Sequence, residues 1–341
     1  MGRLFVAYAR LFRLSGLVGF SMAPVFGALS QVQIGVQINF FALFLLFFIG
    51  VLKSIHGCVM NDYFDIEVDK LSSDTSRRPL VTGEISKKTV VFIAILTVVL
   101  TFIILFGYFY NNQPSFYYSI ICIILAAIVG SIYNKYGKKF LGADFLVGFS
   151  EAIFVLVGAY LVAPSGQLSI FTWVIFFLVF TQYLFMNMII GGIKDADHDY
   201  IFKVKNIAIK TGVKLTKDKR IYLPLSFISI GLIIRFFSVF LVFVPFVFFD
   251  VSFEIWEIIL IFLLVFIVLI LTFRLFSLKS FAERKKILGL FAVQGVLRYS
   301  FVPFLLIPVI GLPFAMVLII LPLIWYFIVT IFSGQDIAPN L

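Results

Sequence analysis

The stretch of sequence that decides the fold runs from residue 38 to residue 69 and reads INFFALFLLFFIGVLKSIHGCVMNDYFDIEVD. Its first part, residues 38–60, is almost entirely apolar and is long enough to cross a bilayer, which takes about 20 residues. An asparagine and four acidic residues follow within the next nine positions. Because acids at the entry to a membrane are costly and usually functional, this stretch predicts a membrane helix that ends in a polar site.

The composition of the whole chain also indicates a membrane protein. Of its 341 residues, 62% are hydrophobic and only 13% are charged, about half the ~25% that is usual in soluble domains. No single soluble core could hide this much apolar surface, which excludes a soluble globular protein, a disordered chain and a disulfide scaffold. Cys58 and Cys122 lie in apolar stretches and match no metal-binding or disulfide spacing.

Apolar segments of membrane-spanning length recur along the chain. Eight of them lie at about residues 11–29, 38–60, 89–110, 116–133, 143–162, 170–191, 222–249 and 256–276. The remaining apolar stretch, 288–332, is interrupted by Arg298, Gly311 and prolines, and is compatible with two spans or with one span and a helix that lies along the interface. Because lipid offers no partners for free backbone groups, the spans are expected to be helices. The sequence therefore predicts an all-α, polytopic transmembrane bundle of nine or ten helices that forms a single domain over residues 1–341.

The basic residues are distributed unevenly between the connections. The chain holds 27 Lys and Arg against 17 Asp and Glu, for a net charge of +10. Lys and Arg occur in the N-terminal segment and after the even-numbered spans, whereas connections 31–37, 111–115 and 164–167 hold none. The positive-inside rule then predicts a cytoplasmic N-terminus. We expect an integral, multi-pass protein of the plasma membrane. Its partner is expected to be the lipid bilayer and not nucleic acid. We also expect no removable signal peptide.

Two of the predicted cytoplasmic loops, 61–88 and 194–220, are long and contain acids as well as basic residues, and we expect them to cap the bundle. In the second loop, Asp195 and Asp199 stand at i and i+4 and share one helix face. Both loops follow even-numbered spans, so their acids are expected to face each other across a cavity on one side of the membrane.

The acids of the first loop have a helical phase. Asp62, Asp65 and Asp69 stand at i, i+3 and i+7 on one face, and Asn61 lies one turn before Asp65, whereas Glu67 falls off this face and is expected in solvent. Three carboxylates on one stripe repel each other and need a counter-ion. Oxygen ligands indicate a hard cation, Mg²⁺ first, which binds a few carboxylates together with substrate phosphates. With Lys and Arg nearby, the two clusters predict a diphosphate held by bridging metal ions.

These residues resemble the signatures of the UbiA superfamily of intramembrane prenyltransferases, and the resemblance extends over most of the chain. It is carried by Asn61-Asp62-x-x-Asp65-x-x-x-Asp69, by Arg78-Pro79-Leu80-x-x-Gly83, by Asp195-x-x-x-Asp199, and by Tyr133 followed five residues later by Lys138. The sequence departs from the family at Leu14-Ser15-Gly16, where many members have Pro and Asn, and at Asn206, where Thr is common.

The resemblance implies a helical bundle around a central cavity, in which a prenyl group moves from a polyprenyl diphosphate to a lipophilic acceptor with Mg²⁺ as the cofactor. The Mg²⁺–diphosphate ligands that it implies are Asn61, Asp65, Asp69, Asp195 and Asp199. The residues that it implies for binding phosphate oxygens are Arg78, Lys138 and Lys205. Three further residues complete the catalytic set: Asp62, which supports the ligands, Tyr133, placed near the reacting carbon, and Arg13.

Several functions remain open at this point. Residues 61–69 look most like the archaeal-type members that alkylate geranylgeranylglyceryl phosphate, which makes ether-lipid biosynthesis the first hypothesis. The alternatives within the family are an aromatic-acid prenyltransferase of quinone biosynthesis and a chlorophyll-synthase-like enzyme. A cation transporter or channel is the alternative of another class. It predicts acids near the bilayer midplane, whereas these acids lie at the ends of predicted spans.

Charged side chains also fall inside the predicted spans, where they require partners within the protein or positions in a cavity. They are Lys53, Glu151, Arg235, Arg274 and Arg298. Glu151 is expected either to bind the acceptor or to pair with one of the arginines. His56, in the second span, is expected either to take a proton from the acceptor or to pack between helices.

Overall fold

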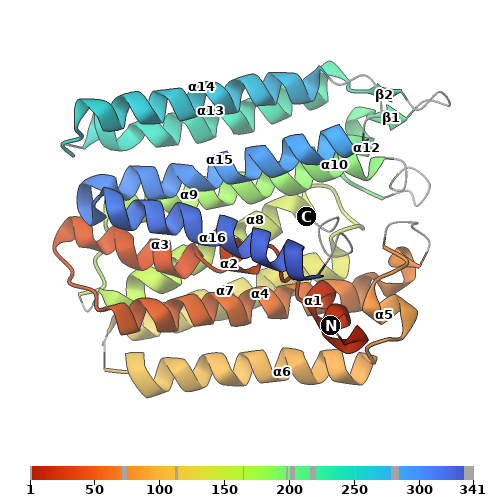
Figure 1. The fold of residues 1–341 in the computed structure, drawn as a ribbon, viewed down its shortest axis with the longest axis horizontal. Coiled ribbons are helices and arrows are strands. Elements are labelled where there is room, and N and C mark those ends of the chain that lie inside the picture. Colours follow the sequence, from red (N-terminus) through yellow and green to blue (C-terminus); the bar gives the residue numbers. More distant parts are fainter. Residues whose placement is uncertain are drawn as a thin grey trace. The chain divides into compact units, whose positions relative to one another are not determined.

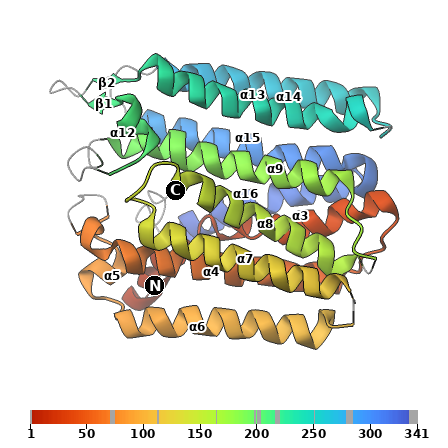
Figure 2. The same ribbon diagram turned by 180° about the vertical axis from the view of Figure 1, so that it is seen from behind.

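The computed structural model describes residues 2–70, 75–111, 114–163, 165–196, 199, 204–215, 220–249, 251–277 and 284–333. This part of the chain is almost wholly helical (Figures 1 and 2), with one sheet of two short strands. Nine of the described helices are long and apolar enough to cross a membrane. The predicted all-α, polytopic architecture is therefore confirmed.

The chain divides into two compact units. Unit 1 comprises residues 1–135, 153–172 and 316–341, and unit 2 comprises residues 136–152 and 173–315. The first acid motif belongs to unit 1 and the second to unit 2. The single domain expected from the sequence stays a prediction, and each unit is described by itself.

Unit 1 contains the N-terminal helices, the first acid motif and most of the last helix. Its elements up to residue 136 are α1 (Arg3–Leu11), α2 (Leu17–Phe20), α3 (Ala23–Ser30), η1 (Gln31–Ile34), α4 (Phe40–Asp69), α5 (Pro79–Thr82), α6 (Lys87–Ile104), η2 (Leu105–Phe109) and α7 (Ser115–Tyr136). Helix α7 ends one residue inside unit 2. The predicted span 11–29 is thus a broken series of short helices. The first break contains Arg13, whose φ of 48° lies in the left-handed region, which a helix cannot include. A second break precedes Pro24, which stands in the first turn of α3.

Two glycines allow α3 to approach α8 (Ala143–Val162) closely. A Cβ atom at Gly158 would lie 1.8 Å from the carbonyl oxygen of Pro24, and one at Gly27 would lie 1.8 Å from the carbonyl oxygen of Val155. Small residues at such crossings are typical of helix packing in membranes. The close approach fixes the last part of the broken segment within unit 1.

Helix α4 carries the first acid motif on its C-terminal turns. Its 30 residues make it the longest of the described helices, and it lies beside α6 in both views (Figures 1 and 2). Under the motif, buried side chains from α1, α4 and α5 form an apolar cluster that includes Leu11, Val59, Ile66 and Leu80. The acids therefore sit on a packed helix rather than on a free loop.

Unit 2 contains the second acid motif. Its elements are the first half of α8, most of α9 (Ile170–Leu184), η3 (Phe185–Gly191), α10 (Gly192–Lys194), α12 (Ile207–Thr211), β1 (Lys214–Leu215), β2 (Ile221–Tyr222), α13 (Leu225–Phe248), α14 (Ile255–Phe276) and α15 (Arg284–Ile310). The strands pair antiparallel, with Lys214 opposite Tyr222. The short helices α5 and α12 and strand β1 lie in the two loops that were expected to cap the bundle, and β2 follows the second loop directly. Residues 71–74, 197–198, 200–203 and 216–219 of these loops lie outside the described residues.

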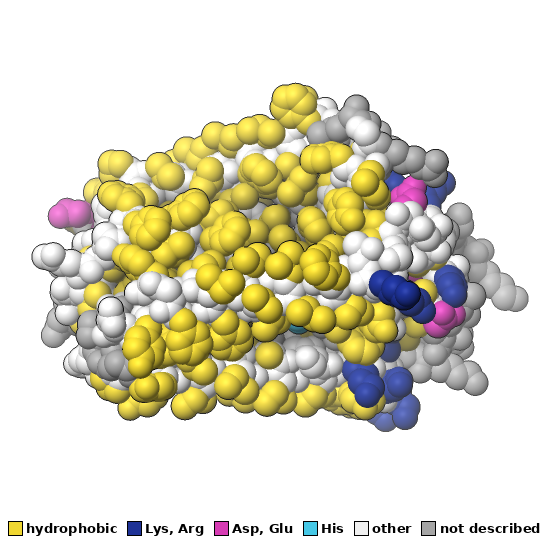
Figure 3. Space-filling model, turned by 90° about the horizontal axis from the view of Figure 1, so that it is seen from below, with side chains coloured by type: hydrophobic (Ala, Val, Ile, Leu, Met, Phe, Trp, Pro, Cys, Tyr) yellow, Lys and Arg dark blue, Asp and Glu magenta, His cyan; other side chains and the backbone are white. Residues whose placement is uncertain are grey.

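The last apolar stretch forms two helices, α15 and α16 (Leu312–Ser333). They are separated by Gly311, whose φ of 78° ends α15. Both helices are long and apolar enough to cross a membrane, which favours two C-terminal spans. Figure 3 shows that hydrophobic side chains cover the length of the drawn face, whereas Lys and Arg gather near one end of it.

Candidate active site

Arg78 is the centre of the first acid motif. It precedes α5, whose first residue is Pro79, and its Nη1 atom donates to Asp62 Oδ1 at 2.9 Å and to Asp69 Oδ2 at 2.7 Å. Both aspartates are only 4% exposed. Because a buried charge without a partner is strongly destabilising, Arg78 compensates two carboxylates at once. The structure therefore places Arg78, which was predicted to bind phosphate, in ion pairs with two of the acids.

Arg13 binds the same motif from the N-terminal segment. Its Nη2 atom donates to Asn61 Oδ1 at 3.0 Å and lies 3.6 Å from Asp62 Oδ1. Asn61 in turn donates from Nδ2 to Asp65 Oδ2 at 3.3 Å. Tyr133 of α7 lies near enough to interact with the charge of Arg13. The left-handed turn at Arg13 thus brings the predicted arginine to the predicted amide and acids.

Glu67 is the acid of this stretch that points away from the motif. Its side chain is 76% exposed and pairs with Lys70 Nζ at 2.9 Å. This position confirms the prediction from helical phase that Glu67 faces solvent. The acidic face of α4 therefore consists of Asp62, Asp65 and Asp69.

The second acid motif follows the continuous run of α9, η3 and α10. The backbone N–H of Asp199 donates to the carbonyl oxygen of Asp195 at 2.9 Å. Asn206 donates from Nδ2 to Asp199 Oδ2 at 2.5 Å, and its Oδ1 accepts from Ile209 N at 2.8 Å, which caps α12. One asparagine side chain therefore orients the acid and also begins the helix after it.

The loop between α7 and α8 also contacts the second motif. The backbone N–H of Lys205 donates to the carbonyl oxygen of Lys138 at 3.1 Å, which brings the two predicted phosphate-binding lysines into one part of unit 2. Burial and the neighbouring Asp195 carboxylate raise the pKa of Asp199 to about 7, against the opposing effects of Lys138 and Asn206. Asp144, at the start of α8, adds to this negative charge.

Two contributors were missed by reasoning from the sequence. Asp144 stands far before the second motif in the chain and had no signal of its own. Asn206 was noted only as a departure from the family pattern, although an asparagine just before a short helix is a recognisable cap. The remaining predicted site residues divide between the units. In unit 1 they are Arg13, Asn61, Asp62, Asp65, Asp69, Arg78 and Tyr133, and in unit 2 they are Lys138, Asp195, Asp199 and Lys205.

The donor atoms of both motifs suit a hard cation, since all are carboxylate or amide oxygens. Among the residues that the structure describes, no three His, Cys, Asp or Glu side chains are grouped so as to hold a metal ion. Mg²⁺ rarely uses such a complete protein cage, because it keeps several waters and binds one or two carboxylates together with phosphate oxygens. Pairs such as Asn61 with Asp65, or Asp195 with Asp199, therefore fit a cation that shares its coordination with a phosphate substrate.

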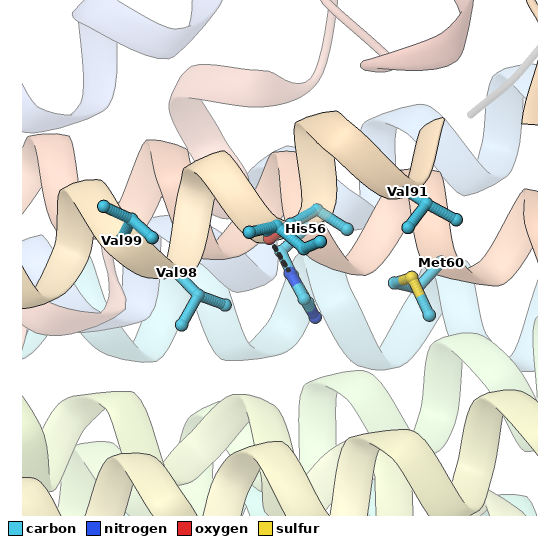
Figure 4. A pocket seen from close by; sticks show the side chains of 7 residues that line it. His56, Met60, Val91, Val98 and Val99 are labelled. Carbon is cyan, nitrogen blue, oxygen red and sulfur yellow. Dashed lines mark hydrogen bonds between the residues drawn. The ribbon is translucent and has the colours of Figure 1, made fainter. Parts of the chain in front are cut away.

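His56 lies in an apolar groove between α4 and α6, within unit 1 (Figure 4). Its Nδ1 atom lies 3.2 Å from the Ala94 carbonyl oxygen and 3.2 Å from Thr97 Oγ1. The other groove-lining residues, which include Met60 and Val98, are apolar. These contacts correspond to the packed histidine that was one of the two expectations for this residue.

The chain is similar to known prenyltransferases. The model of the UbiA prenyltransferase family matches residues 21–293. A protoheme IX farnesyltransferase of Alkalihalophilus pseudofirmus is 31% identical over 125 residues, or 36% of this chain and 38% of the relative. A 4-hydroxybenzoate octaprenyltransferase of Tolumonas auensis is 31% identical over 189 residues, or 54% of this chain and 60% of the relative. The chain thus spans about half the length of the curated relatives that it matches.

Solved structures share the fold. A structure described as that of a digeranylgeranylglyceryl phosphate synthase has a TM-score of 0.64 and 18% identity, covering 91% of this chain and all (100%) of that one. A UbiA homologue from Archaeoglobus fulgidus, bound to GPP and Mg²⁺, has a TM-score of 0.60 and 18% identity, covering 88% of this chain and 99% of that one. The matched family region and the nine apolar helices lead to one conclusion: this chain is an integral, multi-pass membrane protein that belongs to the UbiA prenyltransferase family.

Proposed function

We propose that the chain is a Mg²⁺-dependent intramembrane prenyltransferase that moves a prenyl group from its diphosphate to a lipophilic acceptor. The observation that carries this proposal is the paired network on α4, in which Arg13 and Arg78 hold Asn61, Asp62 and Asp69. Packing of an apolar helix against lipid does not require a network of charged side chains on its last turns. Such a network suits a site where cations and phosphate oxygens are bound at the end of a membrane span.

Each motif would supply ligands for Mg²⁺. Asn61 and Asp65 would supply oxygens from the first motif, and Asp195 and Asp199 from the second. Asp69, which accepts a hydrogen bond from Arg78, would be a further ligand. When bound, Mg²⁺ neutralises the negative charge that develops on a diphosphate leaving group.

The side chains of this chain would perform four tasks in the transfer. The bond between the first prenyl carbon and the diphosphate oxygen breaks, and its electron pair stays with the diphosphate. Lys138 and Lys205 would bind diphosphate oxygens, and Arg78 would keep Asp62 and Asp69 fixed while this charge develops. A nucleophilic atom of the acceptor then bonds to the allylic carbon and loses its proton. Tyr133 would lie near this carbon, and the apolar helices would exclude water from the cation.

Geranylgeranylglyceryl phosphate is the acceptor that we favour, which would assign the protein to ether-lipid biosynthesis. The residues at positions 61–69 and the fold shared with the digeranylgeranylglyceryl phosphate synthase support this choice. An aromatic acid is the second candidate, because a matched relative is named as a 4-hydroxybenzoate octaprenyltransferase. For its location we propose the plasma membrane with a cytoplasmic N-terminus, which the distribution of Lys and Arg supports.

A transfer assay in nanodiscs tests the proposal. Radiolabelled geranylgeranyl diphosphate and Mg²⁺ would be offered with geranylgeranylglyceryl phosphate, with 4-hydroxybenzoate and with a naphthoate, each separately. We expect labelled product with the glycerol phosphate, abolished by EDTA and reduced by Asp65→Asn by at least roughly 100-fold, since even outer-shell changes at metal sites cost 10- to 100-fold. Product with an aromatic acid alone would move the protein to quinone biosynthesis. Absence of product with all three acceptors, together with no Mg²⁺-dependent binding of the diphosphate, would reject the proposed function.

A further inference from the structure

Two arginines are buried inside unit 2, apart from the acid motif. Arg235 lies near the middle of α13 and is 1% exposed, and Arg298 lies near the middle of the apolar part of α15 and is 4% exposed. Both helices are candidate membrane spans. Charged side chains at such positions are rare and usually functional, because moving them out of water is costly.

The two guanidinium groups meet at one aromatic ring. The Cζ atom of Arg235 lies 3.9 Å from the centroid of the Phe185 ring, and that of Arg298 lies 5.2 Å from it. Arg235 donates from Nε to Thr272 Oγ1 at 2.9 Å and from Nη2 to Gln294 Oε1 at 3.4 Å. The ring face and two neutral oxygens stabilise the charge of Arg235, but they add no negative charge to balance two cations.

Arg298 has donors left over. Its Nε atom donates to the carbonyl oxygen of Gln294 at 3.0 Å, whereas Nη1 and Nη2 are buried and have no hydrogen-bond partner. In the described part of the chain, neither Arg235 nor Arg298 has a carboxylate within ion-pair distance, and Glu151 is therefore not the partner of either. Buried polar groups are nearly always satisfied, so the four N–H donors on this guanidinium group can serve an acceptor from outside the chain.

Gly295 leaves open space on the side of α15 that it shares with Arg298. It lies one turn before Arg298 on α15 and is partly exposed, and a Cβ atom built on it would meet nothing within 4 Å. Its neighbours Val293 and Val296 are exposed apolar residues. A hydrocarbon chain on this surface would therefore lie on the same side of α15 as Arg298.

We propose that Arg235 and Arg298 form a binding site for the oxyanion, carboxylate or phosphate, of a lipophilic molecule that enters beside Gly295. The planar fork of Nη1 and Nη2 matches the two oxygens of such a group. The surrounding spans favour an anion that carries its own hydrocarbon over a free hydrated ion. Phe185 precedes Asp195 by ten positions on one helical run, about 15 Å at 1.5 Å per residue, so this site is distinct from the second acid motif and does not rest on the proposed function.

Thermal unfolding of the delipidated full-length protein in neutral detergent tests the proposal. The probes are palmitate, phosphatidylglycerol, phosphatidylcholine and inorganic phosphate. We expect palmitate or phosphatidylglycerol to raise the Tm in a saturable manner, with phosphatidylcholine and inorganic phosphate giving no comparable shift. Arg298→Gln should weaken this binding at least tenfold, Arg298→Lys should weaken it less, and Gly295→Leu should block it while both arginines remain. Arg274→Gln, at an exposed position on α14, is the matched control and should bind as the unaltered protein does.

The two active probes separate the sources of the oxyanion: a response to palmitate alone identifies a carboxylate, and a response to phosphatidylglycerol alone identifies a lipid phosphate. An equal response to inorganic phosphate would overturn the requirement for a lipophilic molecule. Binding that persists unchanged in both Arg298→Gln and Gly295→Leu would overturn the site. A further outcome is that Arg298→Gln lowers the Tm by the same amount whether or not a probe is present. That result would mean that the arginine contributes to packing alone, and it would overturn the proposed site.

Discussion

The two acid motifs hold their carboxylates in opposite ways. In the first, Asp62 and Asp69 are buried, and both accept hydrogen bonds from Arg78 at less than 3 Å (2.9 and 2.7 Å). In the second, Asp199 accepts from a neutral side chain, Asn206, and stands near the like charge of Asp195. The first motif therefore carries an arginine that is hydrogen-bonded to two buried carboxylates, whereas the second has lysines near its acids: Lys194 Nζ lies 3.9 Å from Asp195 Oδ1, and Lys138 opposes the charge effect on Asp199.

Because of this difference, we expect the geometry of the two motifs to depend on a bound cation to different degrees. A carboxylate that is fixed by an arginine has a defined position before any ligand binds. Carboxylates that repel each other are stabilised by whatever cation enters between them. We expect the first motif to keep its geometry without Mg²⁺, and we expect the second motif to be stabilised when Mg²⁺ binds.

Breaking the first motif should have the largest effect. Arg78→Met removes the arginine that donates hydrogen bonds to two buried carboxylates, and breaking a buried pair in this way typically costs 3–5 kcal/mol. We expect the free energy of unfolding to fall by about 3 kcal/mol, together with a loss of prenyl transfer. Thermal or denaturant unfolding in detergent, with and without Mg²⁺, measures the first effect, and the transfer assay measures the second.

The adjacent arginine provides the control for this change. Arg77 is exposed, so Arg77→Met removes a charge of the same sign from the same loop and keeps the hydrogen bonds of Arg78 to Asp62 and Asp69. If both variants lost equal stability, the loss would come from the charge of the loop, and the counter-charge role of Arg78 would be rejected.

A substitution in the second motif should not lower the free energy of unfolding, in contrast to Arg78→Met in the first. Asp199→Asn removes one of two like charges, so the Mg²⁺-free protein should be as stable as the unaltered protein or more stable. Transfer should nevertheless fall by at least roughly 100-fold, because a metal ligand is lost. Unfolding in EDTA and the Mg²⁺ dependence of the transfer rate are the two measurements. Marked destabilisation of Asp199→Asn in EDTA would show that this carboxylate is held as firmly as those of the first motif.

Asn206 sharpens the comparison at a smaller scale, since it is the neutral counterpart of Arg78. Asn206→Ala removes the bond to Asp199 and the cap of α12, and should cost about 1 kcal/mol for the cap and about tenfold in Mg²⁺ affinity as an outer-shell partner. Asn206→Thr retains a capping oxygen and should recover most of the stability. Mg²⁺ titration of transfer, together with unfolding, separates the two contributions; equal Mg²⁺ affinity in both variants and the unaltered protein would remove Asn206 from the site.

Much of the fold was predictable because its determinants are local. The spans from residue 38 to residue 276 follow from apolar length alone, and the structure gives helices of nearly those bounds. The first span was expected at residues 11–29, but the structure breaks it into short helices at Arg13 and before Pro24. A left-handed arginine has no sequence signal, because its conformation depends on bonds to Asn61 far along the chain.

The candidate site was predictable to the level of residue types and helical phase. The face shared by Asp62, Asp65 and Asp69 and the outward position of Glu67 follow from the 3.6-residue period of α4. The use of Arg78 as a counter-charge did not follow, because it depends on how the loop after α4 returns to the helix. The shared ring under Arg235 and Arg298 likewise depends on tertiary packing between three segments.

Glu67 offers the smallest effect and the strictest check on the comparison. It stands within the first motif in sequence, between Asp65 and Asp69, but its side chain is 76% exposed and contacts Lys70. Exposed pairs of this kind contribute little to stability, so Glu67→Gln should leave unfolding, the Mg²⁺ dependence and the transfer rate unchanged. The same removal of one negative charge at Asp65, two residues earlier, should reduce transfer strongly. Equal losses in Glu67→Gln and Asp65→Asn would mean that the motif acts through its total charge, and the division of α4 into a binding face and a solvent face would then be wrong.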